Sequence, residues 1–127
     1  MNYADKHVLL VDDMKVSQMI LNKVIGHHGC SVECADDGRE AVSKIAAAEY
    51  DLVFMDCQMP VMDGFEATRA IRALYNQRGK TGPVIIALTA DTLCADREKC
   101  IAAGMDDFLG KPIKADHIHQ IFTKWFG

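Results

Sequence analysis

The chain has 127 residues, of which half are hydrophobic and a quarter are charged. This composition is typical of a globular protein and excludes wholesale disorder, so residues 1–127 are expected to form one domain. The formal net charge of −4 argues against nucleic acid as a direct partner, because such binding requires neutralised phosphates. No apolar run approaches the ~20 residues of a membrane-spanning helix, and the five cysteines include no C-x-x-C pair. We therefore expect a cytoplasmic protein with reduced thiols and no direct membrane contact.

Five short apolar runs alternate along the chain with longer segments. The runs are residues 7–11, 31–34, 52–55, 84–88 and 107–110. Each has the length of a strand, and the first, third and fourth are apolar throughout, as strands covered on both faces should be. The intervening segments are long enough for helical crossovers between parallel strands. The pattern predicts an α/β fold of the (βα)5 type, which is a doubly wound, open, five-stranded parallel sheet.

The segments between the runs have the patterns of amphipathic helices. In the first segment Val16, Ile20 and Val24 recur at four-residue spacing and are predicted to face the core, with Gly29 as the stop. Residues 37–40 and 63–66 both have the spacing of a capping box. Residues 75–83 are predicted to form a loop, and residues 92–103 a helix that stops at Gly104. The last helix has an apolar stripe of Ile118, Ile121, Phe122 and Trp125.

Polar side chains follow four of the five predicted strands. Asp12 and Asp13 follow the first, Asp56 the third, Thr89 the fourth and Lys111 the fifth. Because the carboxyl ends of parallel strands meet at one edge of a sheet, we expect these side chains to lie close together. Carboxylates suit Mg²⁺, and a carboxylate can also accept a phosphoryl group whose oxygens a metal and an ammonium neutralise. Each residue alone has a commoner structural role, as a cap, a turn residue or a surface charge, but their joint placement predicts a phosphoryl-accepting site.

Four segments of the chain resemble motifs of a single family. Val-Leu-Leu-Val-Asp-Asp (8–13) resembles its acidic first strand, and Met-Asp-Cys-Gln-Met-Pro-Val-Met-Asp-Gly (55–64) resembles its phosphoacceptor strand and loop. Leu-Thr-Ala (88–90) resembles its switch segment, and Gly-Met-Asp-Asp-Phe-Leu-Gly-Lys-Pro (104–112) resembles the segment that ends in Lys-Pro. The family is that of the receiver domains of two-component response regulators, and the resemblance covers essentially the whole chain. It implies a flavodoxin-like sheet with strand order 2-1-3-4-5.

The resemblance implies a role for each residue of the predicted site. Asp56 would be phosphorylated, and Lys111 would pair with the phosphoryl group. The ligands of Mg²⁺ would be Asp12, Asp13, Asp56 and the backbone carbonyl of Gln58. The domain would catalyse its own phosphorylation and dephosphorylation without being a free-standing enzyme.

The resemblance also implies a conformational switch after phosphorylation. Thr89 would turn toward the phosphoryl group, and Phe108 would then rotate inward. The peptide bond between Lys111 and Pro112 would be cis.

The predicted site contains no histidine, so the phosphoryl donor is expected to be a separate group. The resemblance implies a phosphohistidine on a histidine kinase or on a histidine phosphotransfer protein. This partner is predicted to dock beside the site on the exposed side of the first helix and on the segment after Lys111. The residues predicted for this surface are Met14, Ser17, Gln18, Leu21, Pro112 and Ile113.

The sequence leaves two origins of the domain open, and two other classes of protein are alternatives to a receiver. Residues 56–69 are similar to receivers of hybrid sensor histidine kinases, which favours a piece of such a protein over a stand-alone single-domain response regulator. A phosphatase of the haloacid dehalogenase type would have a second Asp where Gln58 lies. A flavodoxin-like electron carrier would have hydroxyls and glycine where Asp12 and Asp13 lie, and these acids would repel a flavin phosphate.

Overall fold

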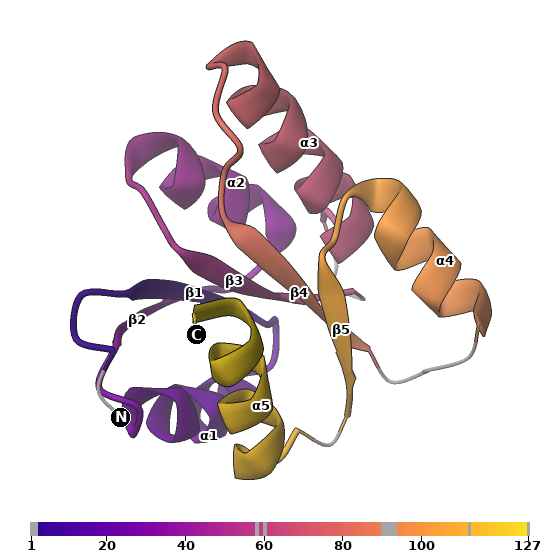
Figure 1. The fold of residues 1–127 in the computed structure, drawn as a ribbon. Helices are drawn as coiled ribbons and strands as arrows, with labels where there is room; N and C mark the ends of the chain where they lie inside the picture. Colours follow the sequence, from indigo (N-terminus) through magenta and orange to yellow (C-terminus); the bar gives the residue numbers. More distant parts are fainter. Residues whose placement is uncertain (1–2, 58, 60, 90–93, 112, 127) are drawn as a thin grey trace.

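The computed structural model describes residues 3–57, 59, 61–89, 94–111 and 113–126, and only the backbone of residues 94–97. Five parallel strands alternate with five helices in this part of the chain (Figure 1). The strands are β1 (His7–Val11), β2 (Ser31–Ala35), β3 (Leu52–Asp56), β4 (Val84–Thr89) and β5 (Asp107–Gly110). The helices are α1 (Lys15–Gly26), α2 (Gly38–Ala47), α3 (Gly64–Gln77), α4 (Cys94–Ala103) and α5 (Ala115–Phe126). The strand order β2-β1-β3-β4-β5 confirms the predicted doubly wound sheet.

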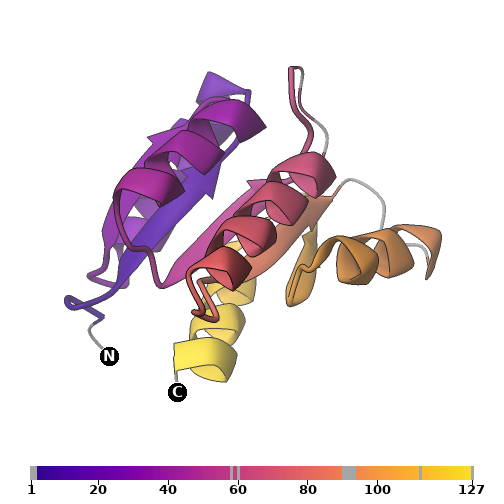
Figure 2. The ribbon, with the colours of Figure 1, turned by 90° about the horizontal axis from the view of Figure 1, so that it is seen from above.

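The sheet is covered on both faces, with α1 and α5 on one side and α2, α3 and α4 on the other (Figures 1 and 2). Successive residues of a strand point to opposite faces, so each strand contributes to two cores. Val8 and Leu10 of β1 lie in the core under α1 and α5, whereas Leu9 and Val11 lie in the core under α2 and α3. The inner strands β1, β3 and β4 are largely buried on both faces and are therefore mostly apolar, whereas the edge strands β2 and β5 are only partly buried and contain polar residues.

The caps of α2 and α3 are those that the sequence predicts. The Asp37 side chain accepts a hydrogen bond from the Glu40 N–H at 2.8 Å, and the Asp63 side chain accepts one from the Glu66 N–H at 2.9 Å. Gly104, with φ of 103°, follows α4 in the left-handed conformation expected of a stop. Position 92, the predicted start of α4, lies outside the described residues. None of the helices in the described part of the chain is long and apolar enough to cross a membrane.

The predicted loop at residues 75–83 is wrong at its start, since α3 continues to Gln77. Tyr75 is buried and lies one turn after Ile71, which itself lies one turn after Ala67. These three residues form one apolar stripe at four-residue spacing, and their burial against the sheet carries the helix beyond the predicted boundary.

The predicted core face of α1 is wrong at two of its three positions. The buried residues of this helix are Gln18, Leu21 and Ile25, whereas Val16 and Ile20 are 66% and 56% exposed and only Val24 packs, partly buried, against the core. Apolar residues surround most of this helix, so two different stripes fit a helical period and the pattern alone does not choose between them. The packed structure buries Leu21 and Ile25 in the core together with Gln18, whose side chain donates hydrogen bonds to acceptors at the ends of two strands.

Candidate functional site

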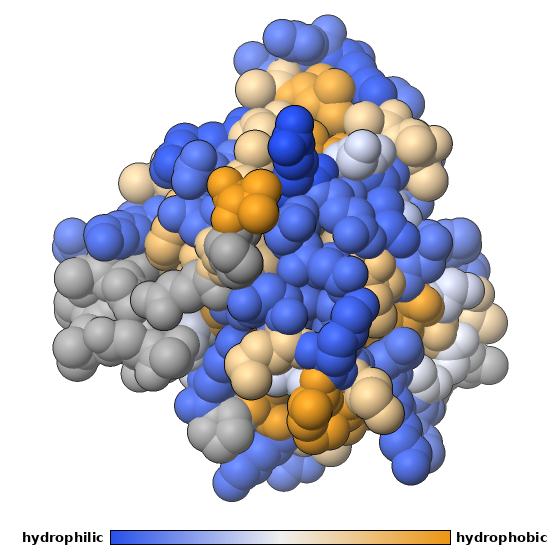
Figure 3. Space-filling model, turned by 180° about the vertical axis from the view of Figure 1, so that it is seen from behind, coloured by the Kyte–Doolittle hydropathy of each residue, from blue (hydrophilic) through white to orange (hydrophobic). Residues whose placement is uncertain are grey.

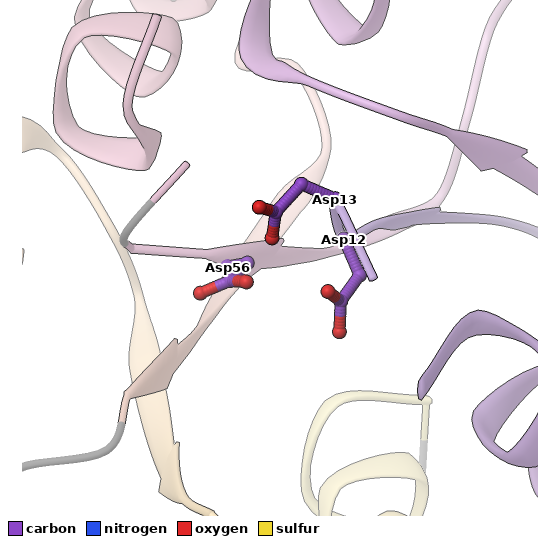
Figure 4. Close-up of side chains that lie close together, drawn as sticks. All are labelled: Asp12, Asp13 and Asp56. Carbon is purple, nitrogen blue, oxygen red and sulfur yellow. The ribbon is translucent and has the colours of Figure 1, made fainter. Parts of the chain in front are cut away.

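Three carboxylates meet at the carboxyl edge of the sheet, as predicted (Figure 4). Asp12 and Asp13 follow β1, and Asp56 is the last residue of the neighbouring strand β3. One oxygen atom from each of the three side chains lies within 4.8 Å of the others. Asp12 and Asp56 are buried and Asp13 is exposed, so the cluster opens to solvent on the side of Asp13.

The hydrogen bonds of Asp12 show that this cluster suits a cation. Its Oδ1 accepts a hydrogen bond from the Met14 N–H at 2.9 Å. Its Oδ2 is buried and accepts no hydrogen bond from the described residues. A buried carboxylate oxygen without a donor is costly, and a second carboxylate nearby increases the cost by repulsion. A hard divalent cation bound among the three carboxylates would satisfy this oxygen and offset the repulsion.

Lys111 brings a positive charge to the same place. Its Nζ lies 3.2 Å from Asp56 Oδ2, and its backbone N–H donates to the Thr89 carbonyl at 2.8 Å. The second bond holds the segment after β5 against the end of β4, which keeps the lysine at the acidic edge. Thr89 is buried at the last position of β4, one residue beyond the register partner of Asp56. The structure therefore brings together the acidic and ammonium groups that the sequence placed at strand ends, and it places Thr89 at the end of the neighbouring strand β4.

Phe108 lies in β5, paired in register with Ala87. It is partly buried and packs against the core on the α2 and α3 side of the sheet. Thr89 and Ala87 are two residues apart in β4, so their side chains point to the same face. Phe108, Ala87 and Thr89 therefore occupy neighbouring positions on one face of the sheet. The predicted switch through Thr89 and Phe108 stays a prediction. Gln58, the predicted carbonyl ligand, and Pro112, predicted to follow a cis peptide bond, lie outside the described residues.

Gly64 has a role at this site that the sequence pattern did not reveal. As the first residue of α3, it donates its N–H to the Cys57 carbonyl at 3.1 Å. A Cβ at this position would overlap the backbone carbonyl oxygen of Asp56 and lie 2.9 Å from the Cys57 Cα. Glycine therefore lets the start of α3 pack directly against the end of the strand that carries Asp56. The only sequence signal was its place after the cap residue Asp63.

Gln18 also helps to hold the site together, a role that the sequence pattern did not reveal. Its Nε2 donates hydrogen bonds to the Asp12 carbonyl, to the Ala35 carbonyl at 3.3 Å and to Asp36 Oδ1 at 2.8 Å. Lys15 Nζ lies 2.7 Å from the same Asp36 oxygen. The hydrogen bonds from Lys15 and then from Gln18 hold the pKa of Asp36 below its usual value. The end of β1, the end of β2 and α1 are thus joined through one buried amide.

The predicted docking surface is therefore wrong at two positions. Gln18 and Leu21 are each only 6% exposed, because they belong to the core face of α1. Met14 is 58% exposed, while Ser17 and Ile113 are partly exposed, so these three residues stay candidates for a partner surface.

Exposed apolar side chains gather on α1 and its cap, visible on the lower part of the face in Figure 3. They are Met14, Val16, Met19 and Ile20, which are 56% to 72% exposed. A hollow of about 420 Å³, here called the α1 groove, lies beside them. Its lining residues are Asp12, Ser17, Ile20, Leu21, Lys111 and Ile113. The groove therefore connects the acidic site to the apolar surface of α1.

Comparisons with known proteins agree with the site. The family model described as response regulator receiver domain matches residues 8–123. Hybrid signal transduction histidine kinase B of Dictyostelium discoideum is 44% identical over an alignment 119 residues long, which covers 87% of this chain but 6% of that protein. The chain thus corresponds to a small part of this relative's length.

Two solved structures are similar over nearly the whole chain. One is a chain in the co-crystal structure of the Saccharomyces cerevisiae histidine phosphotransfer protein Ypd1 and the receiver domain of Ssk1. Its TM-score is 0.90 at 33% identity, with 94% of this chain and 88% of that chain covered. The other is the receiver domain of sensor histidine kinase PA1611 from Pseudomonas aeruginosa PAO1, which has a magnesium ion in its active site cleft. Its TM-score is 0.85 at 42% identity, with 96% and 98% covered. The resemblance of the sequence motifs is confirmed: this chain belongs to the response regulator receiver domain family.

Proposed function

We propose that this receiver takes a phosphoryl group from a phosphohistidine onto Asp56 and that Mg²⁺ is required for the transfer. The observation that carries the proposal is the cluster of three carboxylates with Lys111 Nζ 3.2 Å from Asp56 Oδ2. The cation would be held by Asp12, Asp13 and Asp56, with the backbone carbonyl of Gln58 as a further ligand. When bound, Mg²⁺ supplies positive charge that neutralises the oxygens of the transferred group.

Asp56, Lys111 and Thr89 each have a separate role in the phosphoryl transfer. An Asp56 carboxylate oxygen forms a bond to phosphorus while the bond from phosphorus to the donor imidazole nitrogen breaks, and the imidazole leaves with the bonding electron pair. Lys111 pairs with a phosphoryl oxygen, and the Thr89 hydroxyl donates a hydrogen bond to another. The same groups orient the acyl phosphate for attack by water, so the domain catalyses its own phosphorylation and dephosphorylation.

Phosphorylation of Asp56 also drives a switch through Thr89 and Phe108. The new phosphoryl oxygens are strong acceptors beyond the end of β3, which draws the Thr89 hydroxyl toward them. Since Thr89 and Phe108 occupy neighbouring positions on the same face beside the small Ala87, movement of Thr89 leaves space into which the aromatic ring rotates. The changed surface is then read by other proteins.

The donor is a helical protein that presents its phosphohistidine at the α1 groove. Apolar side chains of α1 that face solvent next to a phosphoryl-accepting site support this docking surface. The revised docking residues are Met14, Ser17, Ile20 and Ile113, with Pro112 as a further candidate. The donor class is a histidine kinase or a histidine phosphotransfer protein, such as the Ypd1 found with the Ssk1 receiver domain.

The domain acts in the cytoplasm as the receiver of a hybrid sensor histidine kinase. Its 44% identity to a small part of a Dictyostelium hybrid kinase supports this origin. A stand-alone response regulator is the alternative, and the coding sequence on either side of this segment distinguishes the two.

The test of the phosphoacceptor is chemical. Incubation with acetyl phosphate and Mg²⁺ should add one phosphoryl group to the intact protein, and site mapping should place it on Asp56. EDTA should prevent the reaction, and Asp56→Asn should remove it. Labelling of Asp56→Asn at the wild-type rate would overturn the assignment.

The docking surface needs a separate test with a matched control. Ile20→Glu should slow transfer from a phosphorylated histidine phosphotransfer protein at least tenfold by placing charge in the α1 groove, and should leave labelling by acetyl phosphate unchanged. Ile101→Glu makes the same change at a 67% exposed isoleucine of α4, away from the groove, and should affect neither reaction. Equal effects of the two variants on transfer would contradict the proposed surface.

A further inference from the structure

The buried amide of Gln18 has no part in the phosphoryl chemistry proposed above. Its side chain lies on the core face of α1, where apolar residues are the rule. Its amide NH₂ group donates hydrogen bonds to three acceptors: the carbonyls of Asp12 and Ala35 and the carboxylate of Asp36. All three acceptors lie at or directly after the carboxyl ends of β1 and β2. One side chain of a helix therefore holds the edge of the sheet at which the acidic site is built.

The hydrogen bond to the Asp12 carbonyl also orients Asp13, because both residues contribute to the same peptide plane. Because the peptide unit is planar, a donor that fixes the direction of this carbonyl also fixes the N–H and Cα of Asp13. The rest of Asp12 is held by neighbours as well: its N–H donates to the Ala35 carbonyl at 3.1 Å, and its Oδ1 accepts from the Met14 N–H at 2.9 Å. Its Oδ2 is left for an incoming cation, since no described residue donates to it.

We propose that Gln18 is a positioning residue, which orients the Asp12 and Asp13 carboxylates and thereby sets the affinity of the receiver for Mg²⁺. The inference rests on the proposed function, because it assumes that the cluster binds Mg²⁺. The anchor for Gln18 is itself fixed, since Asp36 is also bound by Lys15 at 2.7 Å. The path from Lys15 through Asp36 and Gln18 to Asp12 consists entirely of hydrogen bonds in the described part of the chain.

Gln18→Met is the informative change. Methionine fills a similar space and is unbranched, so the packing of α1 is retained while both donors are lost. The Asp12 carbonyl then lacks its side-chain donor, and the peptide between the two acids is free to rotate. Loss of outer hydrogen-bond partners of metal ligands weakens metal binding by roughly 10–100-fold, and we expect a rise of about tenfold in the Mg²⁺ dissociation constant.

The control is a second variant that loses one partly buried side-chain hydrogen bond away from the site. Tyr50 precedes β3, whereas Asp56 ends it, and the Tyr50 hydroxyl donates to Glu33 at 2.7 Å. Tyr50→Phe removes this bond and should destabilise the fold without changing Mg²⁺ affinity. A purely structural role of Gln18 would make the two variants alike.

The experiment has two readouts on the full chain. Calorimetric titration gives the Mg²⁺ affinity of wild type, Gln18→Met and Tyr50→Phe, and Gln18→Asn serves as a second variant whose amide is too short to reach the carbonyls. NMR of the metal-free protein follows the amide signals of Asp12 and Asp13, and compares solvent exchange of the Gln18 side-chain NH₂ with that of the exposed Gln77.

The expected result is weaker Mg²⁺ binding in both Gln18 variants, unchanged binding in Tyr50→Phe, shifted Asp12 and Asp13 signals, and slow exchange of the Gln18 NH₂. Wild-type Mg²⁺ affinity in a folded Gln18 variant would overturn the positioning role and leave the proposed function intact. Exchange of the Gln18 NH₂ as fast as that of Gln77 would also overturn it. A wild-type protein that binds no Mg²⁺ and is not labelled at Asp56 would overturn the proposed function, and the inference with it.

Discussion

Replacement of Asp12 by asparagine should stabilise the metal-free protein, although most substitutions of buried residues destabilise. The carboxylate oxygens of Asp12 and Asp56 lie within 4.8 Å of each other, and both side chains are buried. At an effective dielectric constant near 20, two unit charges at this separation repel by about 3.5 kcal/mol. Attraction by Lys111 and screening by solvent and salt reduce the measurable part, and we expect a gain of about 1–2 kcal/mol.

The geometry of Asp12 favours this change. In the Asp12→Asn variant the amide oxygen of the new side chain can still accept the hydrogen bond from Met14, and the amide NH₂ replaces Oδ2, which has no donor among the described residues. The NH₂ group can then donate to the neighbouring carboxylates. The variant loses a ligand for the cation, so the stabilisation that Mg²⁺ gives by binding the folded state should largely disappear.

Thermal unfolding in EDTA and in millimolar Mg²⁺ measures both effects. For a domain of this size 1 kcal/mol corresponds to a shift of about 3–6 °C, so Asp12→Asn should melt roughly 3–12 °C above wild type in EDTA. The gain should fall only slightly as the salt concentration rises, because both carboxylates are buried. The control, Asp51→Asn, makes the same change at an exposed carboxylate before β3, which accepts from the His7 N–H at 2.8 Å, and should change stability by no more than about 0.5 kcal/mol. A lower melting temperature of Asp12→Asn in EDTA, with an undiminished Mg²⁺ effect, would refute the electrostatic argument.

Three further predictions concern packing and pH. Gly64→Ala should lower the free energy of unfolding in urea by about 1–3 kcal/mol, because the new Cβ would overlap the Asp56 carbonyl. The control Gly26→Ala, with no atom within 4 Å of its Cβ, should raise this free energy by up to about 1 kcal/mol, and equal effects of the two changes would contradict the close approach of α3. Burial, and then repulsion from a neighbouring histidine, lower the pKa of His28, so the unfolded chain takes up a proton before the folded one does. Stability should therefore be full above about pH 6.5 and fall as the pH drops below it, and melting curves of His28→Phe should show a smaller fall. Burial and a hydrogen bond to a glutamate raise the pKa of Tyr50 to about 12, so stability should fall as the pH rises from about 10 to about 12, and urea titrations of Tyr50→Phe should lack this loss.

The order of the elements and the membership of the acidic site were predictable because both follow from local patterns. Apolar runs of strand length, separated by helical segments, leave a parallel sheet as the natural solution, and the residues after its strands must then share one edge. The same logic applies to the caps at Asp37 and Asp63, where a side chain and an N–H three residues apart decide the start of a helix. Thus Asp12, Asp56 and Lys111 could be placed together before any tertiary contact was known.

The orientation of α1 was decided by the tertiary structure alone. This helix has apolar residues around most of its circumference, so a stripe with Val16 and Ile20 and a stripe with Leu21 and Ile25 are both consistent with a helical period. What separates them is the position of Gln18, whose amide reaches acceptors at the ends of β1 and β2 only when its stripe faces the sheet. A partner that is distant in sequence leaves no mark in a local pattern, and for the same reason the contact of Gly64 with the Asp56 carbonyl became visible only in the folded chain.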